Sequence, residues 1–306
     1  MALYTGLALF AGAGGLELGL KLALGEDRYK CVAYVERSAE AASVLATQME
    51  RGGLDKGVIW DDVTSFTGDI VSPFVDNIDI MSAGCPCQPW SVAGARKGTE
   101  DERWLWPHIF RLVREIRPRS IFLENVPGLF HGGIEHVLGD LASVGFDAEW
   151  ISVRASDVGA PHRRERVFIL AHRTSRGSEG SGLPVRSGRP QQAEAVVDGR
   201  SRELGNADSQ RRRAQGDSEL TPAGIGWGCR PFQWPPGPGS TEDWREVIEV
   251  RPDLAPAIKP EVRGVANGMA GGLARNDRLR ILGNGVVPQQ AALAFQILKE
   301  RIDAQD

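Results

Sequence analysis

The feature that most constrains the fold is a glycine-rich turn, LFAGAGG at residues 9–15, between an apolar run and an amphipathic run. Residues 5–10 have the composition of a buried strand, and residues 15–24 carry apolar side chains at helical spacing. Glycines at such a junction let the backbone approach a ligand at the positively polarised start of the helix. The turn therefore predicts a βα unit that binds a ligand. A tight turn needed only for helix packing is the alternative.

The same alternation of apolar and amphipathic runs continues to residue 172, which predicts a βα-repeated, mainly parallel sheet. The predicted strands span residues 5–10, 31–35, 57–60, 78–82, 120–123, 148–153 and 166–171. The predicted helices span residues 15–24, 39–50, 106–116, 134–144 and 289–301, and a turn is predicted at GNGVVP, residues 283–288.

The composition of the sequence changes after residue 172. Residues 173–239 contain 12 Gly and 7 Pro, which predicts a loop-rich segment. Residues 173–213 hold nine Arg, no Lys and five acids, a net charge of +4 in a chain whose total is −4. This segment is a candidate phosphate-binding face, and a solvated loop is an equally good interpretation.

Composition excludes several classes of protein. The chain has 306 residues, of which 42% are hydrophobic and 25% charged, as in a globular protein able to bury its own core. No run approaches the ~20 apolar residues of a membrane span, and no basic segment precedes the first apolar run, so a cytoplasmic protein is expected. The four cysteines, at 31, 85, 87 and 229, lack zinc spacing, so neither a metal site nor a disulfide framework is predicted.

Carboxylates follow the second and third predicted strands. Glu36 is placed to accept both hydroxyls of a ribose, and Asp62, followed by Val63, to accept from an adenine amino group. For Asp62 a role as a turn or helix cap is at least as good an interpretation. The turn at residues 9–15 lacks the Gly-x-Gly-x-x-Gly spacing of a dinucleotide site. It therefore favours an adenosyl ligand without a pyrophosphate.

A thiol and a carboxyl follow the next two strands. Cys87 lies in GCPCQPWS, residues 84–91, beyond a strand end where open α/β sheets bind ligands, and nearby arginines would favour a nucleophilic thiolate. Glu124, followed by Asn125, reaches the same edge and is a candidate proton donor. A buried, inert thiol and a carboxylate that complements a helix dipole are the alternatives.

Two arginines mark the last predicted strand. Alternation would place Arg164 and Arg166 on one face, where their guanidinium groups can grip a carbonyl oxygen or a phosphate. A solvated run of charges is the ordinary alternative.

In this order and spacing, the motifs resemble the cytosine-C5 DNA methyltransferase family of bacterial and phage type. The resemblance covers about residues 5–172 and 260–300. It rests on FAGAGG at 10–15, Glu36, Asp62-Val63, GCPCQ at 84–88, ENV at 124–126, RER at 164–166 and GNGVVP at 283–288.

The resemblance implies a Rossmann-like S-adenosylmethionine-dependent methyltransferase fold with a small, loop-rich target recognition domain. It implies a catalytic and cofactor-binding domain at residues 1–172, the recognition domain at 173–279, and a C-terminal segment at 280–306 that returns to the first. It also implies double-stranded DNA as partner and a monomer as sufficient. A cognate restriction endonuclease stays open.

The resemblance also implies the chemistry. Cys87 would attack C6 of a flipped cytosine while Glu124 holds or protonates N3, and C5 then takes the methyl group of S-adenosylmethionine. Arg166 would contact the base carbonyl, with Arg164 in support. The implied cofactor contacts are Phe10, Gly12, Gly14, Glu36, Asp62, Val63, Pro86, Asn284 and Val286. The implied substrate contacts are Gln88, Ser91, Arg103 and Asn125.

Three departures from the family pattern stand out. Ala8 occupies a position where many members carry Asp, VRGVANG at 262–268 is a variant motif whose arginine is Arg263, and the segment from 173 to 261 is short and glycine-rich. The alternatives are a transfer RNA cytosine-C5 methyltransferase, a non-catalytic DNA-binding homologue and a nicotinamide dehydrogenase. The dehydrogenase has no use for Cys87.

Overall fold

The computed structural model describes residues 3–72, 77–85, 104–160, 162–173 and 275–305. All of them belong to one compact unit. The predicted recognition domain at 173–279 lies outside the described residues except for Arg173 and residues 275–279. Its extent therefore stays a prediction.

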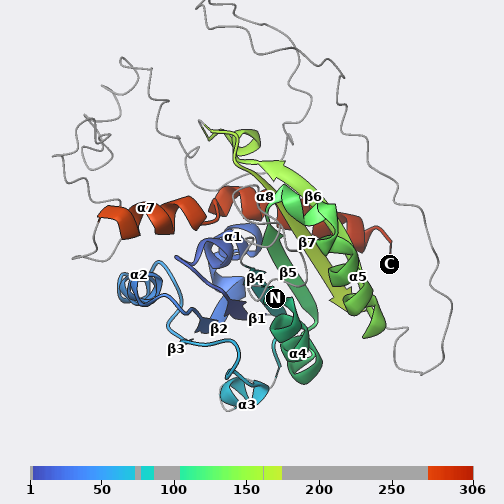
Figure 1. The fold of residues 1–306 in the computed structure, drawn as a ribbon, viewed down its shortest axis with the longest axis horizontal. Coiled ribbons are helices and arrows are strands. Elements are labelled where there is room, and N and C mark those ends of the chain that lie inside the picture. Colours follow the sequence, from blue (N-terminus) through green and yellow to red (C-terminus); the bar gives the residue numbers. More distant parts are fainter. Residues whose placement is uncertain (1–2, 73–76, 86–103, 161, 174–274, 306) are drawn as a thin grey trace, which may run out of the picture. The chain divides into compact units, whose positions relative to one another are not determined.

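The described chain forms one seven-stranded sheet with the order β3-β2-β1-β4-β5-β7-β6 (Figure 1). All neighbouring strands pair in parallel except β7, which is antiparallel to both β5 and β6. The α/β fold class expected from the sequence is confirmed. The strands are β1 (Tyr4–Leu9), β2 (Tyr29–Val35), β3 (Val58–Trp60), β4 (Ile80–Gly84), β5 (Ser120–Asn125), β6 (Phe146–Arg154) and β7 (Glu165–Arg173).

The order of the strands reverses at β1. This strand pairs with β2 on one side and with β4 on the other, so the chain builds the sheet outward in both directions from it. In open α/β sheets, ligands bind in the crevice beyond the carboxyl ends of the strands at such a reversal. The glycine-rich turn follows β1 at this point.

Helices cover both faces of the sheet (Figure 1). Apolar side chains of α1, α2 and α8 pack in one core cluster, and those of α3, α4 and α5 pack in the other. No helix of the described segments is long and apolar enough to cross a membrane. The helices are α1 (Gly15–Leu24), α2 (Ala39–Glu50), α3 (Gly68–Val71), α4 (Trp106–Ile116), α5 (Gly133–Ser143), α7 (Arg275–Asn284) and α8 (Pro288–Asp303), with 3-10 turns at Glu26–Arg28, Pro127–His131 and Ala155–Val158.

The predicted helices at 15–24, 39–50 and 106–116 have the observed bounds. The last two strands are longer than predicted because β6 and β7 pair with each other over nine residues each. Strand β4 lies two residues later than predicted, at Ile80–Gly84 instead of 78–82. Helix α7 was not predicted, and only its last two residues overlap the turn predicted at 283–288.

Close approach of α1 and α8 places the C-terminal segment beside the first βα unit. A methyl group built at Gly19 would lie 2.7 Å from the Ala291 Cβ and 2.9 Å from the Pro288 carbonyl oxygen. One built at Gly15 would lie 2.5 Å from the Val286 carbonyl oxygen. Only glycine permits contacts this short, so these two positions fix the C-terminal segment against the start of α1.

Candidate active site at the carboxyl edge of the sheet

The described residues that the sequence singled out gather at one edge of the sheet. The parallel strands β1 to β5 end there, and β7 begins there because it runs in the opposite direction. The pairing of Asn125 with Val167 places the end of β5 beside the start of β7. The carboxyl of Glu124 and the guanidinium of Arg166 therefore meet although 42 residues separate them in the sequence.

The glycine-rich turn has an unusual backbone. Phe10, Gly12 and Gly14 all have positive φ, of 52°, 56° and 81°. A positive φ is uncommon for phenylalanine and is retained only where the surroundings impose it. The Ala11 N–H donates to the carbonyl of Val35 (3.1 Å), which ties the turn to the end of β2. A methyl group at Gly12 would meet no atom of the described residues within 4 Å, so among these residues the turn is open at this position.

Glu36 holds the glycine-rich turn against the next strand. Its Oε2 accepts from the backbone N–H of Gly12 (2.8 Å), and its Oε1 accepts from the N–H of Ser38 (2.8 Å). Each carboxylate oxygen has a second acceptor position. The predicted contact with a ribose is compatible with these bonds, and it remains a prediction.

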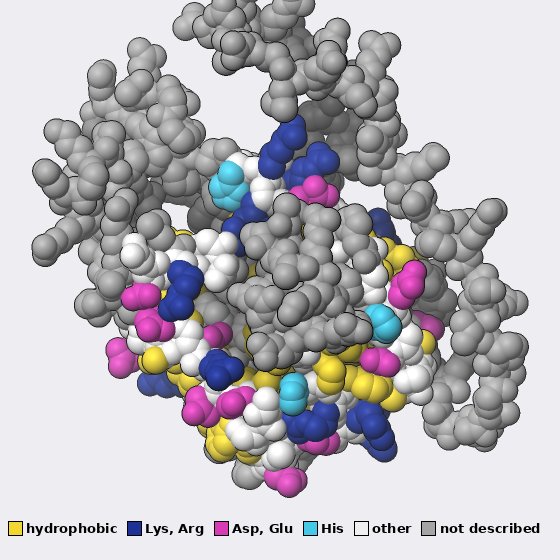
Figure 2. Space-filling view, viewed as in Figure 1, with side chains coloured by type: hydrophobic (Ala, Val, Ile, Leu, Met, Phe, Trp, Pro, Cys, Tyr) yellow, Lys and Arg dark blue, Asp and Glu magenta, His cyan; other side chains and the backbone are white. Residues whose placement is uncertain are grey.

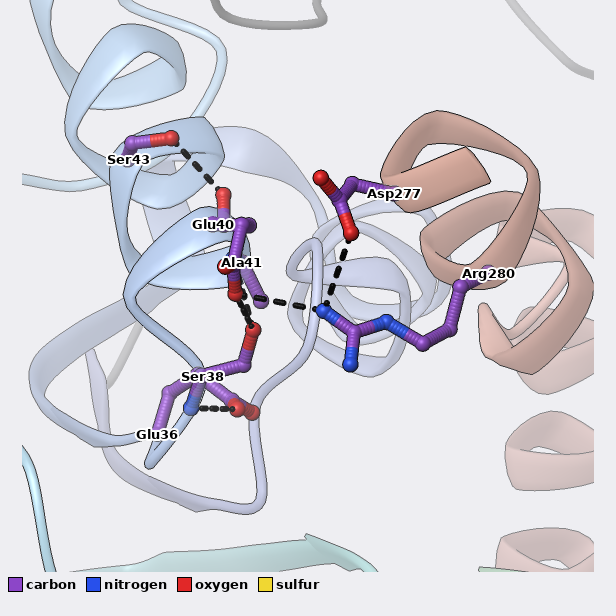
Figure 3. A network of polar contacts seen from close by, with 7 residues as sticks. All are labelled: Glu36, Ser38, Glu40, Ala41, Ser43, Asp277 and Arg280. Carbon is purple, nitrogen blue, oxygen red and sulfur yellow. Dashed lines mark hydrogen bonds and ion pairs between the residues drawn. The ribbon is translucent and has the colours of Figure 1, made fainter. Parts of the chain in front are cut away.

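A polar network extends from Glu36 to α7 (Figure 3). The Ser38 hydroxyl caps α2 by accepting from the Ala41 N–H (3.3 Å), and it donates to Glu40 Oε2 (2.6 Å). Glu40 Oε2 also forms an ion pair with Arg280 Nη2 of α7 (3.2 Å), and the same nitrogen contacts Asp277 (3.4 Å). This arginine was not among the predicted residues because α7 itself was not predicted.

Asp62 behaves as a turn cap. Its Oδ1 accepts from the Thr64 N–H (2.8 Å), and hydrogen bonding to Thr64 lowers the pKa of the Asp62 carboxyl. The neighbouring Val63 is buried, and its carbonyl accepts from Arg111 Nη2 (2.9 Å). The alternative interpretation of Asp62 as a cap is thus what the structure shows, while its contact with an adenine stays a prediction.

A largely buried ion pair at this edge joins Glu124 and Arg166. Arg166 Nε lies 2.8 Å from Glu124 Oε1, and the two side chains are 16% and 9% exposed. Burial raises the pKa of the Glu124 carboxyl, and the positive charges of Arg166 and Arg164 oppose this rise. A charged hydrogen bond in a position with so little solvent exposure fixes the carboxyl in one orientation.

Apolar walls explain why the Glu124 carboxyl is poorly solvated. It borders a cavity of about 20 Å³ whose other walls include Trp104, Trp106 and Ile109. The same cavity is lined by Cys85, the last described residue before the predicted nucleophile. The Asn125 amide reaches back toward the Cys85 carbonyl (3.5 Å), so β4 and β5 stay joined past the end of their ladder.

Gly84 brings the two halves of this edge together. It pairs with Glu124 in the β4–β5 ladder. A methyl group at Gly84 would lie 3.5 Å from the Phe10 carbonyl oxygen and 3.8 Å from Glu124 Oε2. The glycine-rich turn and the buried carboxyl therefore lie on either side of one glycine.

The expectation that strand alternation orients both arginines is wrong for Arg164. Strand β7 begins only at Glu165, and Arg164 has a φ of +25°. Its Nη2 donates to the carbonyl of Gly285 in the C-terminal segment. The break in the strand turns this side chain toward Gly285, while Arg166 turns toward Glu124.

Several predicted site residues lie outside the described residues. These are Pro86, Cys87, Gln88, Ser91 and Arg103. In the C-terminal segment, Asn284 is exposed as the last residue of α7, and Val286 is half-buried with its carbonyl facing Gly15. The cofactor and substrate contacts assigned to all of these remain predictions.

Charge does not mark a DNA-binding face on the side of the molecule shown in Figure 2. There, Lys and Arg side chains of the described residues are interspersed with Asp and Glu. The arginine-rich stretch at 173–213 lies outside the described residues apart from Arg173. Its interpretation as a phosphate-binding face stays a prediction.

Comparison with known proteins assigns the family. Residues 4–218 match the model of the C-5 cytosine-specific DNA methylase family. The match spans most of the chain, which therefore belongs to this family, and the resemblance drawn from the motifs is confirmed.

The chain spans about half or less of the length of two curated relatives that it matches. It is 36% identical to the type II methyltransferase M.NgoMIV of Neisseria gonorrhoeae over 55% of this chain and 51% of that protein. It is also 36% identical to the type II methyltransferase M.CviJI of Paramecium bursaria Chlorella virus IL3A, over 55% of this chain and 42% of that protein. Among solved structures it is similar to an E. coli prophage protein described as a DNA modification methyltransferase. The two are 31% identical, the match covers 58% of this chain and 49% of that chain, and the TM-score is 0.46.

One buried residue at this edge was missed by the sequence analysis. Gln290 is fully buried in α8 and donates to the carbonyls of Val153 (2.6 Å) and Arg164 (2.8 Å). Its spacing from Ala294 and Leu298 places a polar side chain on the apolar stripe of the helix. An amide on such a stripe is a signal for a buried hydrogen bond, and it was available in the sequence.

Proposed function

We propose that this protein transfers a methyl group from S-adenosylmethionine to C5 of a cytosine flipped out of double-stranded DNA, within a specific sequence. Membership of the cytosine-C5 DNA methylase family supports the reaction. The observation that carries the proposal is the buried Glu124–Arg166 pair at the edge where the glycine-rich turn also lies.

The site fits an adenosyl cofactor. The glycine-rich turn is open at Gly12, and the Glu36 carboxylate is held beside it at the reversal point of the sheet. These two, with Phe10, Asp62 and Val63, would hold the cofactor. When bound, S-adenosylmethionine supplies an electrophilic methyl group on a sulfonium.

Cys87 would begin the reaction. Its thiolate attacks C6 of the cytosine, which forms an S–C6 bond and moves electron density through the ring to C5 and N3. C5 takes the methyl group as the methyl–sulfur bond of the sulfonium breaks, which leaves a neutral thioether. The C5 proton then passes to a base, and the electron pair of that C–H bond restores the C5–C6 double bond as the Cys87 thiolate leaves. Extrusion of the base is required because C5 and C6 are inaccessible in the stack.

Glu124 would neutralise the charge that develops on the ring. Its pKa is raised by burial, so a proton is available to N3 at higher pH than from an exposed carboxyl. Arg166 would hold the base carbonyl while its Nε holds Glu124 in place, and Asn125 would shape the wall of the pocket. The pair thus orients both edges of the pyrimidine.

The family favours DNA over transfer RNA as substrate. The relatives are named type II methyltransferases, so a cognate restriction endonuclease is a candidate partner. We propose a monomer, because a single flipped base requires no second copy, and the cytoplasm as its compartment, because bacterial DNA lies there.

Base-resolution cytosine methylation sequencing tests the function. Plasmid DNA from methylation-deficient cells would be compared after expression of wild type, Cys87→Ser or Cys85→Ala, the last being a matched control at the neighbouring buried thiol. We expect methylation in one recurring context with wild type and Cys85→Ala and none with Cys87→Ser. An unmethylated plasmid from folded wild-type protein would refute the DNA reaction. Methylation by Cys87→Ser would refute the nucleophile.

A further inference from the structure

Gln290 uses both amide protons inside the protein. The side chain is fully buried, and Nε2 donates to the carbonyls of Val153 and Arg164, at 2.6 Å and 2.8 Å. Val153 lies near the end of β6, and Arg164 directly precedes β7. One side chain of α8 therefore joins both ends of the connection between these strands.

The connection that Gln290 holds has an unusual backbone. Arg164 has a φ of +25°, which is strained for a residue with a side chain. The Ala155 N–H contacts the carbonyl oxygens of Arg163 (2.8 Å) and Arg164 (3.3 Å), so this backbone is fixed from two directions. Arg166, two residues further on, makes the 2.8 Å contact with Glu124. The direction in which β7 leaves this turn thus decides where the Arg166 guanidinium lies.

A second contact returns from the turn to the C-terminal segment. The Arg164 guanidinium donates to the carbonyl of Gly285, five residues before Gln290. The carbonyl of Val286, between them, packs against Gly15 at the start of α1. Residues 285–290 consequently contact Arg164, directly before the strand that contains Arg166, and Gly15, the first residue of the helix that follows the glycine-rich turn.

We propose that Gln290 is a positioning residue for the proposed methyl transfer. By holding the Arg164 carbonyl, it keeps the Arg166 guanidinium aligned with Glu124 and with the cofactor side of the site. This rests on the proposed function for its catalytic consequence. The contact between Arg166 and Glu124 can be measured without any activity, so the two can fail separately.

Replacement of Gln290 by Met tests the role. Methionine has a similar length and volume but donates no hydrogen bond, so both carbonyls lose the hydrogen bond from Gln290. The matched control is Gln296→Met on the same helix, because the Gln296 side-chain oxygen is buried without a partner among the described residues. The first readout is the ¹⁵N resonance of the Arg166 Nε–H, assigned by its loss in Arg166→Lys.

We expect Gln290→Met to shift this resonance and to accelerate exchange of its proton with water at least about tenfold, since the ion pair that shields it loosens. Gln296→Met should leave both unchanged. We also expect kcat for DNA methylation to fall at least about tenfold, while the Kd for S-adenosylmethionine stays within about threefold. A merely structural defect would weaken both the methylation rate and the binding of S-adenosylmethionine in parallel.

An Arg166 resonance in Gln290→Met that matches wild type overturns the proposal, whether or not the protein methylates DNA. So does an altered resonance with an unchanged kcat. If folded wild type transfers no methyl group, the proposed function fails, and the resonance alone decides the positioning role. If Gln290→Met does not fold, Gln290→Asn replaces it, because its amide stays polar but is withdrawn from the carbonyls by one methylene. The outcomes stated for Gln290→Met then apply to Gln290→Asn.

Discussion

The buried carboxyl of Glu17 leads to a prediction about stability and pH. Glu17 lies in the first turn of α1 and is 1% exposed. Its Oε1 accepts from the Ser82 hydroxyl (2.7 Å), and its Oε2 has no partner among the described residues. Burial, which the Ser82 hydrogen bond only partly offsets, raises the pKa of Glu17 from 4.5 to about 7.

The sign of the effect follows from which state binds the proton more tightly. Between pH 4.5 and about 7 the folded protein keeps the Glu17 proton that the unfolded chain has released, so the free energy of unfolding falls as pH rises through this window. Below it both states are protonated, and above it both are ionised. The difference between the two pKa values corresponds to about 3 kcal/mol of stability lost across the window.

Glu17→Gln removes this titration while it keeps the oxygen that accepts from Ser82. Urea unfolding of the full chain at several pH values from 4.5 to 8 would give the free energy of unfolding of wild type and variant. We expect the variant to gain about 3 kcal/mol relative to wild type between the two ends of the range. Glu50→Gln, at an exposed position of α2, is the control and should follow wild type. Parallel curves for wild type and Glu17→Gln would refute a buried, proton-binding Glu17.

Two further predictions concern the C-terminal helices. Gly19→Ala should destabilise the protein by about 1–3 kcal/mol because its methyl group would overlap Ala291 and Pro288. Gly139→Ala should not destabilise it, because a methyl group there meets no atom within 4 Å in the part of the chain that the structure describes. Thermal unfolding of the two variants measures both effects, and equal melting temperatures would contradict the close packing of α1 on α8. Arg280→Ala breaks an exposed contact with Glu40, so its effect on the melting temperature should be small and should disappear in 1 M salt. A loss that persists in high salt would show that Arg280 does more than form this pair.

Elements with strong periodicity and clear ends were predictable from the sequence. Helices α1 and α2 were predicted to the residue because an apolar stripe runs through each and Gly14 or Ser38 precedes it. Helix α7 was missed because its sequence, RNDRLRILGN, is mostly polar and ends in residues typical of a turn.

The gathering of candidate residues at one sheet edge was also predictable. Parallel strands end at the same edge, so Glu36 and Glu124 had to lie on one side of the molecule. The position of Arg166 required more than this, because it lies at the start of a strand rather than after the end of one. It reaches the edge only because β7 is antiparallel, and a local pattern does not encode the direction of a strand.

The hydrogen bonds that orient these side chains were beyond a local reading of the sequence. Arg164 departs from strand alternation because the structure holds its backbone at a positive φ through Gln290, which is 126 residues away. Contacts of this range depend on how α8 packs on the sheet, and hence on Gly15 and Gly19. Only the fold as a whole specifies them.

The ordinary and the functional interpretations of these polar residues are compatible. Glu36 fixes Gly12 and Ser38, Asp62 fixes Thr64, and each carboxylate oxygen retains a second acceptor position. A side chain that already holds the backbone has lost its rotamer freedom before any ligand arrives, so a further bond costs little additional order. Local backbone contacts at such positions therefore do not argue against a binding role. They are the means by which this edge of the sheet would be organised in advance for a cofactor and a base.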